Sequence, residues 1–379
     1  KEIRTYYKKD FDERTEIAKE SLLDILSYAG ENVPYYKDLF KKHKFDPFEI
    51  RKDIRYLQKI PYLTKDIVRE EKDRLLSRPL DEIKNFRVKT GGSTGPSCHF
   101  EYDQSAYDYS AAITLYARES IGKYKWKDAI HFATQFPDDP KPKLITREDF
   151  KCFAMNRNNI FFDRLDDQGL EDIANSLRRK KPYLLHAHPS TIYALACYLE
   201  RKKIKEYFFS IFESSGEMLM EYMHDKIKRI FQCKIINRYG LAEFGVIAYQ
   251  LNENHKDIMV LDSEGWPEMR VDESKQNELI FTGFRNYLMP LIRYRTGDEA
   301  EIEKKQDGIY LKKIIGRMHD LVPINGILYP THHIMDIIDH RIGGVQEFQI
   351  DMRSNPPILR LALERDVSKA EVNKKIFKV

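Results

Sequence analysis

The sequence predicts an α/β fold with two domains, and three observations favour it. Apolar residues recur at helical spacing in the first eighty residues, which indicates a helical region at the start of the chain. Beyond a glycine-rich segment near residue 90, helical patterns alternate with short apolar runs, which favours helices layered on a sheet. The chain has 379 residues, of which 42% are hydrophobic, enough for one large core or two ordinary ones.

The first eighty residues are expected to form a helical subdomain. Apolar side chains from Ala18 to Ala29 follow a helical period that stops at Gly30, so we expect the first long helix to end there. Thr64 precedes the next helical stretch, and its hydroxyl can cap that helix by accepting a hydrogen bond from a backbone N–H.

The elements that follow alternate in type. Helices are expected at 105–120 and 169–179, and strands at 128–133, 211–213 and 234–236. Residues 301–303 and 309–311 flank an Asp-Gly turn, the signature of a β-hairpin. We predict a large N-terminal α/β domain at 1–315, with its helical subdomain at 1–80, and a small α+β domain at 316–379.

Composition excludes several functional classes. Lys and Arg total 64 against 60 Asp and Glu, too balanced for a nucleic-acid-binding protein. Four cysteines without a CxxC pair indicate neither a zinc ribbon nor a disulfide framework. The start lacks an apolar leader, and no apolar run reaches membrane-spanning length. We therefore expect a cytoplasmic protein with no nucleic-acid or membrane partner, and the missing initiator Met and the end at Val379 indicate that one or both termini are incomplete.

The glycine-rich segment at 89–96 is the first candidate site. It contains three glycines and three hydroxyl side chains; glycines let backbone N–H groups converge on an anion, and hydroxyls add donors. Its spacing is not that of the common phosphate loop, and a plain surface loop is the alternative. The candidate phosphate-binding residues are Thr90, Gly91, Gly92, Ser93, Thr94 and Gly95.

Four later segments carry further candidate side chains: Ser215-Gly216-Glu217, Arg238-Tyr239-Gly240 with Glu243, Asp298, and Arg317. The first has a glycine that lets the backbone lie flat against a planar ring. The second combines an aromatic face with a carboxylate suited to Mg²⁺. Asp298 can accept the hydroxyls of a ribose, and Arg317 can pair with a phosphate. Taken singly, these residues also fit turns, a core aromatic and a surface helix.

In this order, the five segments resemble the adenylate-forming ligase superfamily, most closely its phenylacetate–CoA ligase branch with the CapK-like proteins. The resemblance covers about residues 21–344. It implies a large N-terminal domain of several subdomains and a small mobile C-terminal domain, of which the printed chain holds an incomplete part. It also implies an AMP-forming acid–thiol ligase that uses ATP, Mg²⁺ and coenzyme A, with a homodimer as a plausible assembly.

The resemblance implies a role for each segment. The glycine loop would hold the β- and γ-phosphates, residues 215–217 would lie on the adenine, and Tyr239 would stack on it beside Arg238 and Gly240. Glu243 would bind Mg²⁺, Asp298 the ribose, and Arg317 the nucleotide beside an interdomain hinge at His319. Thr94, Glu243 and Arg317 are the implied catalytic residues.

The acyl pocket is expected near His131 and Phe132, with His186 and His188 closing the other side. Each histidine is alternatively an ordinary packed or surface residue. The implied substrate is a small carboxylic acid, with aryl acids among the candidates.

Three departures from the family pattern leave rival functions open. The hinge carries His319 instead of Asp or Lys, Gly91 replaces a serine, and Lys374, Lys375 and Lys378 lack the context of the family's C-terminal lysine. Lys65 is a candidate to supply the cation that the glycine loop lacks. The rivals are an acyltransferase or amide-forming relative that takes a preformed adenylate, and a nucleotide-binding protein without catalysis.

Overall fold

The computed structural model describes residues 2–90, 98–134, 147–162, 165–251, 257–271, 277–315, 321–324, 327–330, 334, 337–342, 345–354, 356–363 and 367–376. Contacts group the chain into two compact units. The first comprises Lys1–Thr90, Cys98–Ile121 and Arg238–Gly316, and the second comprises Gly91–Ser97, Gly122–Asn237 and Arg317–Val379. The domain division expected at residue 316 stays a prediction, since residues 316–320 lie outside the described part.

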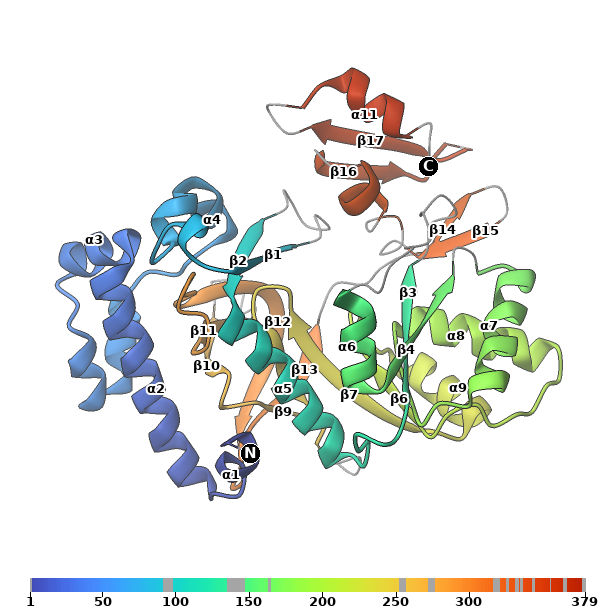
Figure 1. Ribbon diagram of the computed structural model, residues 1–379, viewed down its shortest axis with the longest axis horizontal. Coiled ribbons are helices and arrows are strands. Elements are labelled where there is room, and N and C mark those ends of the chain that lie inside the picture. Colours follow the sequence, from blue (N-terminus) through green and yellow to red (C-terminus); the bar gives the residue numbers. More distant parts are fainter. Residues whose placement is uncertain are drawn as a thin grey trace. The chain divides into compact units, whose positions relative to one another are not determined.

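The first unit opens with the predicted helical region, shown in blue in Figure 1. Its helices are α1 (Glu2–Tyr6), α2 (Phe11–Asn32), α3 (Pro34–His43) and α4 (Lys65–Glu71), with short 3₁₀ turns at Pro47–Arg51, Ile54–Lys59, Lys72–Leu75 and Leu80–Glu82. The predicted cap of α4 is confirmed, because Thr64 Oγ1 accepts a hydrogen bond from the N–H of Ile67 at 3.3 Å. None of the helices described is both long and apolar enough to cross a membrane.

The predicted helix end at Gly30 is wrong. Helix α2 continues to Asn32, and Pro34 then starts α3. A Cβ on Gly30 would lie 2.8 Å from a ring carbon of Phe40 in α3. The glycine therefore lets α3 pack closely against α2, instead of ending the helix.

The first unit continues with a hairpin, a helix and an antiparallel sheet. The hairpin pairs β1 (Asn85–Lys89) with β2 (His99–Asp103), and α5 (Gln104–Ser120) follows as predicted. The sheet runs in the order β10 (Gly265–Val271), β11 (Asn277–Gly283), β12 (Tyr294–Lys304), β13 (Ile309–Ile315), β9 (Ile258–Val260), β8 (Gly245–Tyr249) and the end of β7 (Lys234–Leu241). The β12–β13 pairing confirms the predicted hairpin.

The second unit contains a parallel sheet in the order β4 (Arg157–Phe162), β3 (Ala129–Thr134), β5 (Leu184–Ala187), β6 (Ile211–Ser214) and the start of β7. These strands include the three that the apolar runs predicted. Its helices are α6 (Arg147–Met155), α7 (Asp167–Lys180), α8 (Pro189–Arg201) and α9 (Glu221–Phe231), and α7 is the helix expected at 169–179.

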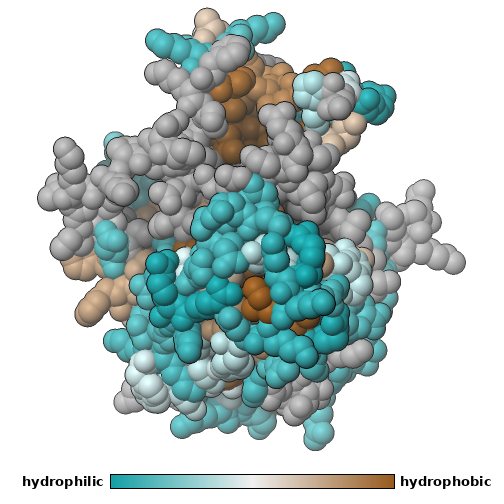
Figure 2. All heavy atoms as spheres, turned by 90° about the vertical axis from the view of Figure 1, so that its right-hand side faces the viewer, coloured by the Kyte–Doolittle hydropathy of each residue, from teal (hydrophilic) through white to brown (hydrophobic). Residues whose placement is uncertain are grey.

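Helices α7, α8 and α9 cover one face of this parallel sheet. Ile130, Leu185 and Phe212, on three neighbouring strands, are buried in one core with Leu177 of α7 and Leu195 of α8. Figure 1 shows α6 on the other side of β3 and β4 from α7. The side of the molecule that Figure 2 turns toward the viewer, where these helices lie, is predominantly hydrophilic, as amphipathic covering helices require.

Strand order in the parallel sheet reverses direction between β3 and β5. The chain passes from β3 outward to β4, crosses back over β3 to β5, and then continues through β6 to β7. In open α/β sheets, a reversal of this kind opens a crevice at the carboxyl ends of the two strands involved, and ligands bind there. This edge of the sheet is therefore a candidate ligand site on topology alone.

The C-terminal segment forms two antiparallel pairs and a small core. One pair is β14 (Leu321–Ile324) with β15 (Ile327–Pro330), and the other is β16 (Val345–Asp351) with β17 (Ile358–Leu363). Helix α11 (Lys369–Ile376) contributes Val372 to a cluster that includes Ile338 and Val345. This mixture agrees with the α+β character expected for residues 316–379.

Candidate active site

Half-buried Tyr239 and buried Asp298 form a hydrogen-bonded pair in the first unit. The hydroxyl of Tyr239 on β7 donates a hydrogen bond of 2.7 Å to Asp298 Oδ2 on β12. Burial, together with the nearby Asp298 carboxylate, raises the pKa of Tyr239 well above its usual value. The phenol therefore remains a neutral donor that holds the carboxylate in place. Two residues that the sequence assigned to one nucleotide site, 59 positions apart, thus lie side by side.

Glu243 lies in the turn between β7 and β8, and it is 4% exposed. Its Oε1 accepts a hydrogen bond of 2.6 Å from the hydroxyl of Tyr294 and lies 3.9 Å from Lys65 Nζ. The hydroxyl of Tyr102 donates to the carbonyl of Ala242 at 2.8 Å, which fixes the turn. The alternative of a surface helix position for Glu243 is therefore wrong, and the candidate cation Lys65 is close to the candidate metal carboxylate.

Tyr294 is a site residue that the sequence reasoning missed. Its backbone neighbours pair with Leu63, since the N–H of Leu63 donates to Arg293 at 3.0 Å and that of Arg295 donates to Leu63 at 2.9 Å. Strand β12 buries alternate residues from Tyr294 to Asp298. The side chains of Tyr294 and Asp298 therefore lie on the same face of the strand. Residues 294–298 (Tyr-Arg-Thr-Gly-Asp) show no apolar alternation, so this burial pattern could not be inferred from the residue types.

The Glu243 carboxylate suits a magnesium ion that takes its other ligands from substrate. Among the described residues, no group of three or more His, Cys, Asp or Glu is arranged to hold a metal. Mg²⁺ in nucleotide sites commonly uses one or two protein carboxylates, with phosphates and water completing its coordination. A single buried carboxylate held by a tyrosine fits that chemistry, whereas a closed all-protein cage does not arise here.

Thr90 and Cys98 hold together the two ends of the predicted phosphate loop. The N–H of Thr90 donates to the carbonyl of Cys98 at 2.9 Å, and the N–H of Cys98 donates to Thr90 Oγ1 at 3.0 Å. Thr90 is thus buried at the base of the hairpin. The other loop residues (Gly91, Gly92, Ser93, Thr94 and Gly95) lie outside the described residues, as do Arg317 and His319.

Gly240 allows β7 and β8 to approach closely beside Tyr239. A Cβ on Gly240 would lie 2.7 Å from the carbonyl oxygen of Gly245, and the register shifts between Tyr239 and Gly240. Arg238, the preceding candidate, pairs in register with Tyr249 of β8. The structure requires glycine at position 240 because the two backbones approach closely there. A role of Gly240 beside a nucleotide stays a prediction.

Ser215, Gly216 and Glu217 follow β6 in the second unit. Gly216 has φ +84°, and a Cβ there would lie 2.7 Å from Nε2 of His188, so only glycine fits this turn without strain. Glu217 accepts hydrogen bonds from the N–H of Ser190 at 3.1 Å and from its hydroxyl at 3.0 Å. Its carboxylate thus interacts with the first turn of α8, and contact of this segment with an adenine stays a prediction.

His131 and Phe132 face opposite sides of the parallel sheet. The His131 ring contacts that of His186 on β5, with ring centroids 4.8 Å apart. Phe132 is buried in the core under the helices and meets Phe162 edge-on at 5.7 Å. His131 and His186 therefore come together as the pocket prediction requires, whereas the described contacts of Phe132 are those of a core residue.

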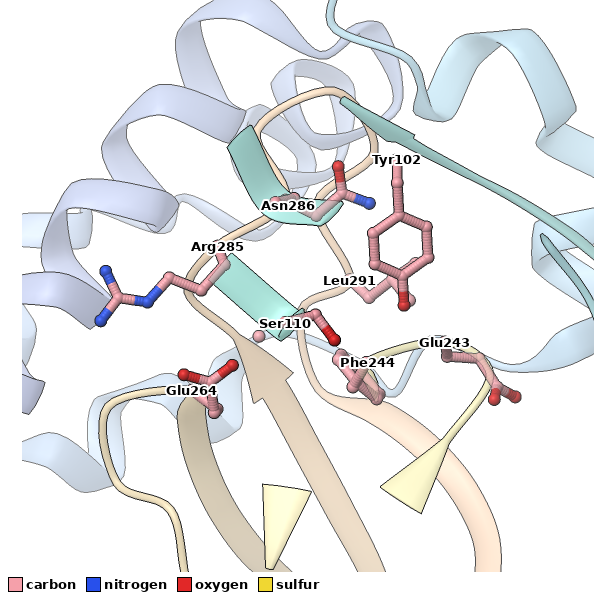
Figure 3. A pocket seen from close by; sticks show the side chains of 10 residues that line it. Tyr102, Ser110, Glu243, Phe244, Glu264, Arg285, Asn286 and Leu291 are labelled. Carbon is pink, nitrogen blue, oxygen red and sulfur yellow. The ribbon is translucent and has the colours of Figure 1, made fainter. Parts of the chain in front are cut away.

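A small cavity of about 20 Å³ lies within the first unit, large enough for one water molecule. Tyr102, Ser110, Phe244, Glu264 and Asn286 are among its lining residues. In Figure 3 the carboxylate of Glu264 points toward Ser110, while that of Glu243 points away from the other labelled side chains. Glu243 also lines the cavity, so the cavity adjoins the residue whose carboxylate would meet a ligand.

Glu264 should make the stability of the protein pH-dependent. Burial raises the pKa of its carboxyl from 4.5 to about 8, although Arg285 and Ser263 partly oppose the shift. The folded protein then keeps a proton that the unfolded chain releases above pH 4.5. The resulting stabilisation is full below that pH and is lost as the pH rises through about 8. We expect wild type to lose roughly 2–4 kcal/mol relative to Glu264→Gln between pH 5 and 8.5.

Urea unfolding at a series of pH values measures this difference. Glu31→Gln, at an exposed position of α2, is the matched control and should follow the wild-type profile. Parallel profiles for wild type and Glu264→Gln would contradict the prediction.

Comparisons with known proteins place the chain among relatives. No protein-family model matches it. It is 27% identical to protein CapK of Staphylococcus aureus over 319 residues, which cover 81% of this chain and 68% of that protein. It is 23% identical to the phenylacetate–coenzyme A ligase of Escherichia coli strain K12 over 375 residues, which cover 93% of this chain and 83% of the ligase.

A solved structure of 2-hydroxyisobutyryl-CoA ligase, in complex with 2-HIB-AMP and CoA, matches with a TM-score of 0.65 and 18% identity, covering 96% of this chain and 82% of that one. This match confirms the predicted α/β fold of the adenylate-forming ligase type. The sequence relatives carry the names that the five segments predicted, so the chain is similar to protein CapK and to phenylacetate–coenzyme A ligases.

Proposed function

We propose that this protein is an ATP-dependent, AMP-forming ligase that activates a small carboxylic acid and transfers the acyl group to the thiol of coenzyme A. The observation that carries the proposal is the pair of tyrosine–carboxylate contacts in the first unit. Tyr239 holds Asp298 and Tyr294 holds Glu243, so two carboxylates from segments far apart in sequence are fixed in position. The names of the sequence relatives support the same activity.

The reaction begins with activation, because a carboxylate is a poor electrophile. Its oxygen attacks the α-phosphorus of ATP, the bond to the bridging oxygen breaks, and pyrophosphate leaves. The thiolate of coenzyme A then attacks the carbonyl carbon of the adenylate, and AMP leaves. The protein contributes mainly by positioning the reactants and by stabilising negative charge on the phosphates.

Each described residue has a part in this scheme. Asp298 would accept hydrogen bonds from the ribose hydroxyls, held in place by Tyr239. Glu243 would ligate Mg²⁺, which would neutralise charge on the departing pyrophosphate. Lys65 would add a second positive charge beside it, 3.9 Å from the carboxylate oxygen. The glycine loop that follows Thr90 would bind the terminal phosphates.

Pyrophosphate release from ATP with a panel of acids, with and without coenzyme A, tests the proposal. Release that needs acid, followed by thioester formation with coenzyme A, is the expected result. Binding of a preformed adenylate without release would favour an acyltransferase or amide-forming enzyme. ATP binding without turnover would favour a nucleotide-binding protein without catalysis.

Asp298→Asn should weaken AMP binding in the same assay series, because an amide presents one acceptor oxygen instead of two. Asp225→Asn, at an exposed position of α9, is the control that should leave AMP affinity unchanged. Equal AMP affinity in wild type and both variants would remove Asp298 from the site.

A further inference from the structure

One face of the parallel sheet carries a row of polar side chains. Asn159 on β4, His131 on β3, His186 on β5 and Glu213 on β6 are register partners in turn. Register partners in a parallel sheet point to the same side, so the four side chains form one line across neighbouring strands. We refer to these four residues as the polar row.

The polar row contrasts with the rest of the sheet. The opposite face is apolar and packs under the covering helices, with Ile130, Leu185 and Phe212 in its core. Strands of a parallel sheet are usually buried on both faces and apolar throughout. Burying amide, imidazole and carboxylate groups costs free energy unless each group is paired. A row of four such residues therefore indicates a functional site in preference to simple packing.

Three members of the row contact one another in turn. Glu213 is fully buried, and its Oε2 lies 2.8 Å from Nδ1 of His186, whose side chain is 15% exposed. The ring of His131 is tilted by 36° against that of His186. A carboxylate beside one imidazole nitrogen fixes the orientation of the ring and of its second nitrogen. The contacts thus pre-orient hydrogen-bonding groups at the surface of the row.

The position of the row matches the place where topology expects a ligand. His131 and His186 belong to β3 and β5, the two strands at which the strand order reverses. Glu213 directly precedes the Ser214-Ser215-Gly216-Glu217 segment, which contains the candidate adenine contacts. An acid that reacts with the α-phosphate of ATP must be bound near the nucleotide. The polar row is therefore a good candidate for the wall that meets the acyl group.

The chemistry of the row selects the kind of acyl group. A metal is not indicated, since the described His, Cys, Asp and Glu residues form no group of three or more arranged to hold one. The single carboxylate already lies against His186, so a further charged group on the substrate would lack a counter-ion within the row. A hydroxyl both donates and accepts, as do an imidazole and an amide. The match is therefore to an uncharged hydroxyl.

We propose that the polar row selects carboxylic acids whose acyl part carries a hydroxyl group. This inference rests on the proposed ligase function and specifies its substrate class. A site built to hydrogen-bond a substrate hydroxyl discriminates strongly against the analogue that lacks it, because its buried polar groups then lose a partner.

Matched acid pairs that differ by one hydroxyl test the proposal. Phenylacetate with 4-hydroxyphenylacetate, benzoate with 4-hydroxybenzoate, and butanoate with 3-hydroxybutanoate are compared by calorimetric binding in the presence of AMP and by acid-dependent pyrophosphate release. We expect the hydroxylated member of at least one pair to be preferred by about 100-fold or more in kcat/KM or affinity. Equal or better use of every unhydroxylated acid, or binding of none of the acids, overturns the proposal.

Variants of the row separate selectivity from folding. His186→Leu alone leaves Glu213 buried without its partner, so the double variant His186→Leu with Glu213→Leu is also made, because removing both partners is better tolerated. The hydroxyl preference should fall toward unity in the double variant, while AMP binding is retained. His224→Leu, at a partly exposed position of α9, should keep the wild-type preference.

The remaining outcomes distinguish this inference from the proposed function. Loss of rate that is equal for both members of each pair would assign the row to a general-base or structural role and overturn the selectivity. Absence of ATP and AMP binding in wild type would refute the ligase function itself, and the inference with it. Turnover of acids without a hydroxyl preference would refute only the inference.

Discussion

Replacing Glu243 with glutamine is expected to lower kcat for acid-dependent pyrophosphate release by about 10²- to 10³-fold, the loss typical when one group that stabilises transition-state charge is removed. The substitution keeps the shape of the side chain, and an amide oxygen can still accept the hydrogen bond from the Tyr294 hydroxyl. What it removes is the negative charge that would bind Mg²⁺.

Steady-state kinetics at varied Mg²⁺ concentration measure this effect. Binding of AMP, which carries no pyrophosphate, should change little, so loss of both AMP binding and activity would indicate a misfolded turn. Glu301→Gln, at an exposed position of β12, is the matched control and should keep the wild-type rate. A normal kcat in Glu243→Gln would show that this carboxylate does not serve the reaction.

The second large effect is expected from the buried ion pair of Arg14 and Asp262. Their nearest atoms, Nε and Oδ2, are 3.0 Å apart, and both side chains are less than a tenth exposed. Arg14 also donates to the backbone carbonyl of Asp307 at 2.7 Å. Burial raises the pKa of Asp262, and the Arg14 guanidinium opposes this rise. Arg14→Leu would leave this carboxylate buried without its cation, which should cost about 3–5 kcal/mol of stability.

The double variant Arg14→Leu with Asp262→Leu sharpens the test. Removing both charges eliminates the unpaired group, so the double variant should unfold at a higher denaturant concentration than Arg14→Leu alone. Arg51→Leu breaks the exposed pair with Glu20, whose side chains are each 55% exposed, and should shift the unfolding midpoint little. If Arg14→Leu shifted the unfolding midpoint as little as Arg51→Leu does, the buried pair would not stabilise the fold as argued.

Local signals explain why much of the fold was predictable. Three features depend only on neighbours within a few residues: the cap at Thr64, the Asp-Gly turn at 307–308 and the helical period of 105–120. The structure has all three. Gly30 misled the sequence reasoning for the opposite reason. Its role is a contact with Phe40 in the next helix, and a glycine required by packing looks the same in sequence as one that ends a helix.

The candidate site was predictable in composition, although much of its geometry was not. Tyr239, Glu243 and Asp298 stood out by type and order, yet Tyr294 was missed because its link to Glu243 spans 51 positions. His131 and His186 were noticed singly. Their alignment with Glu213 depends on the register of three strands joined by long crossovers, which short-range patterns do not encode.

The boundary between the two units falls within strand β7. This limits which insertions and deletions the gene can tolerate there. The first half of the strand pairs with β6 and its second half with β8. Deleting or inserting a single codon between Lys234 and Tyr239 would turn every later side chain of the strand to the opposite face. Tyr239 would then lose Asp298, its partner across the sheet. Changes in the length of this strand would therefore have to be compensated immediately.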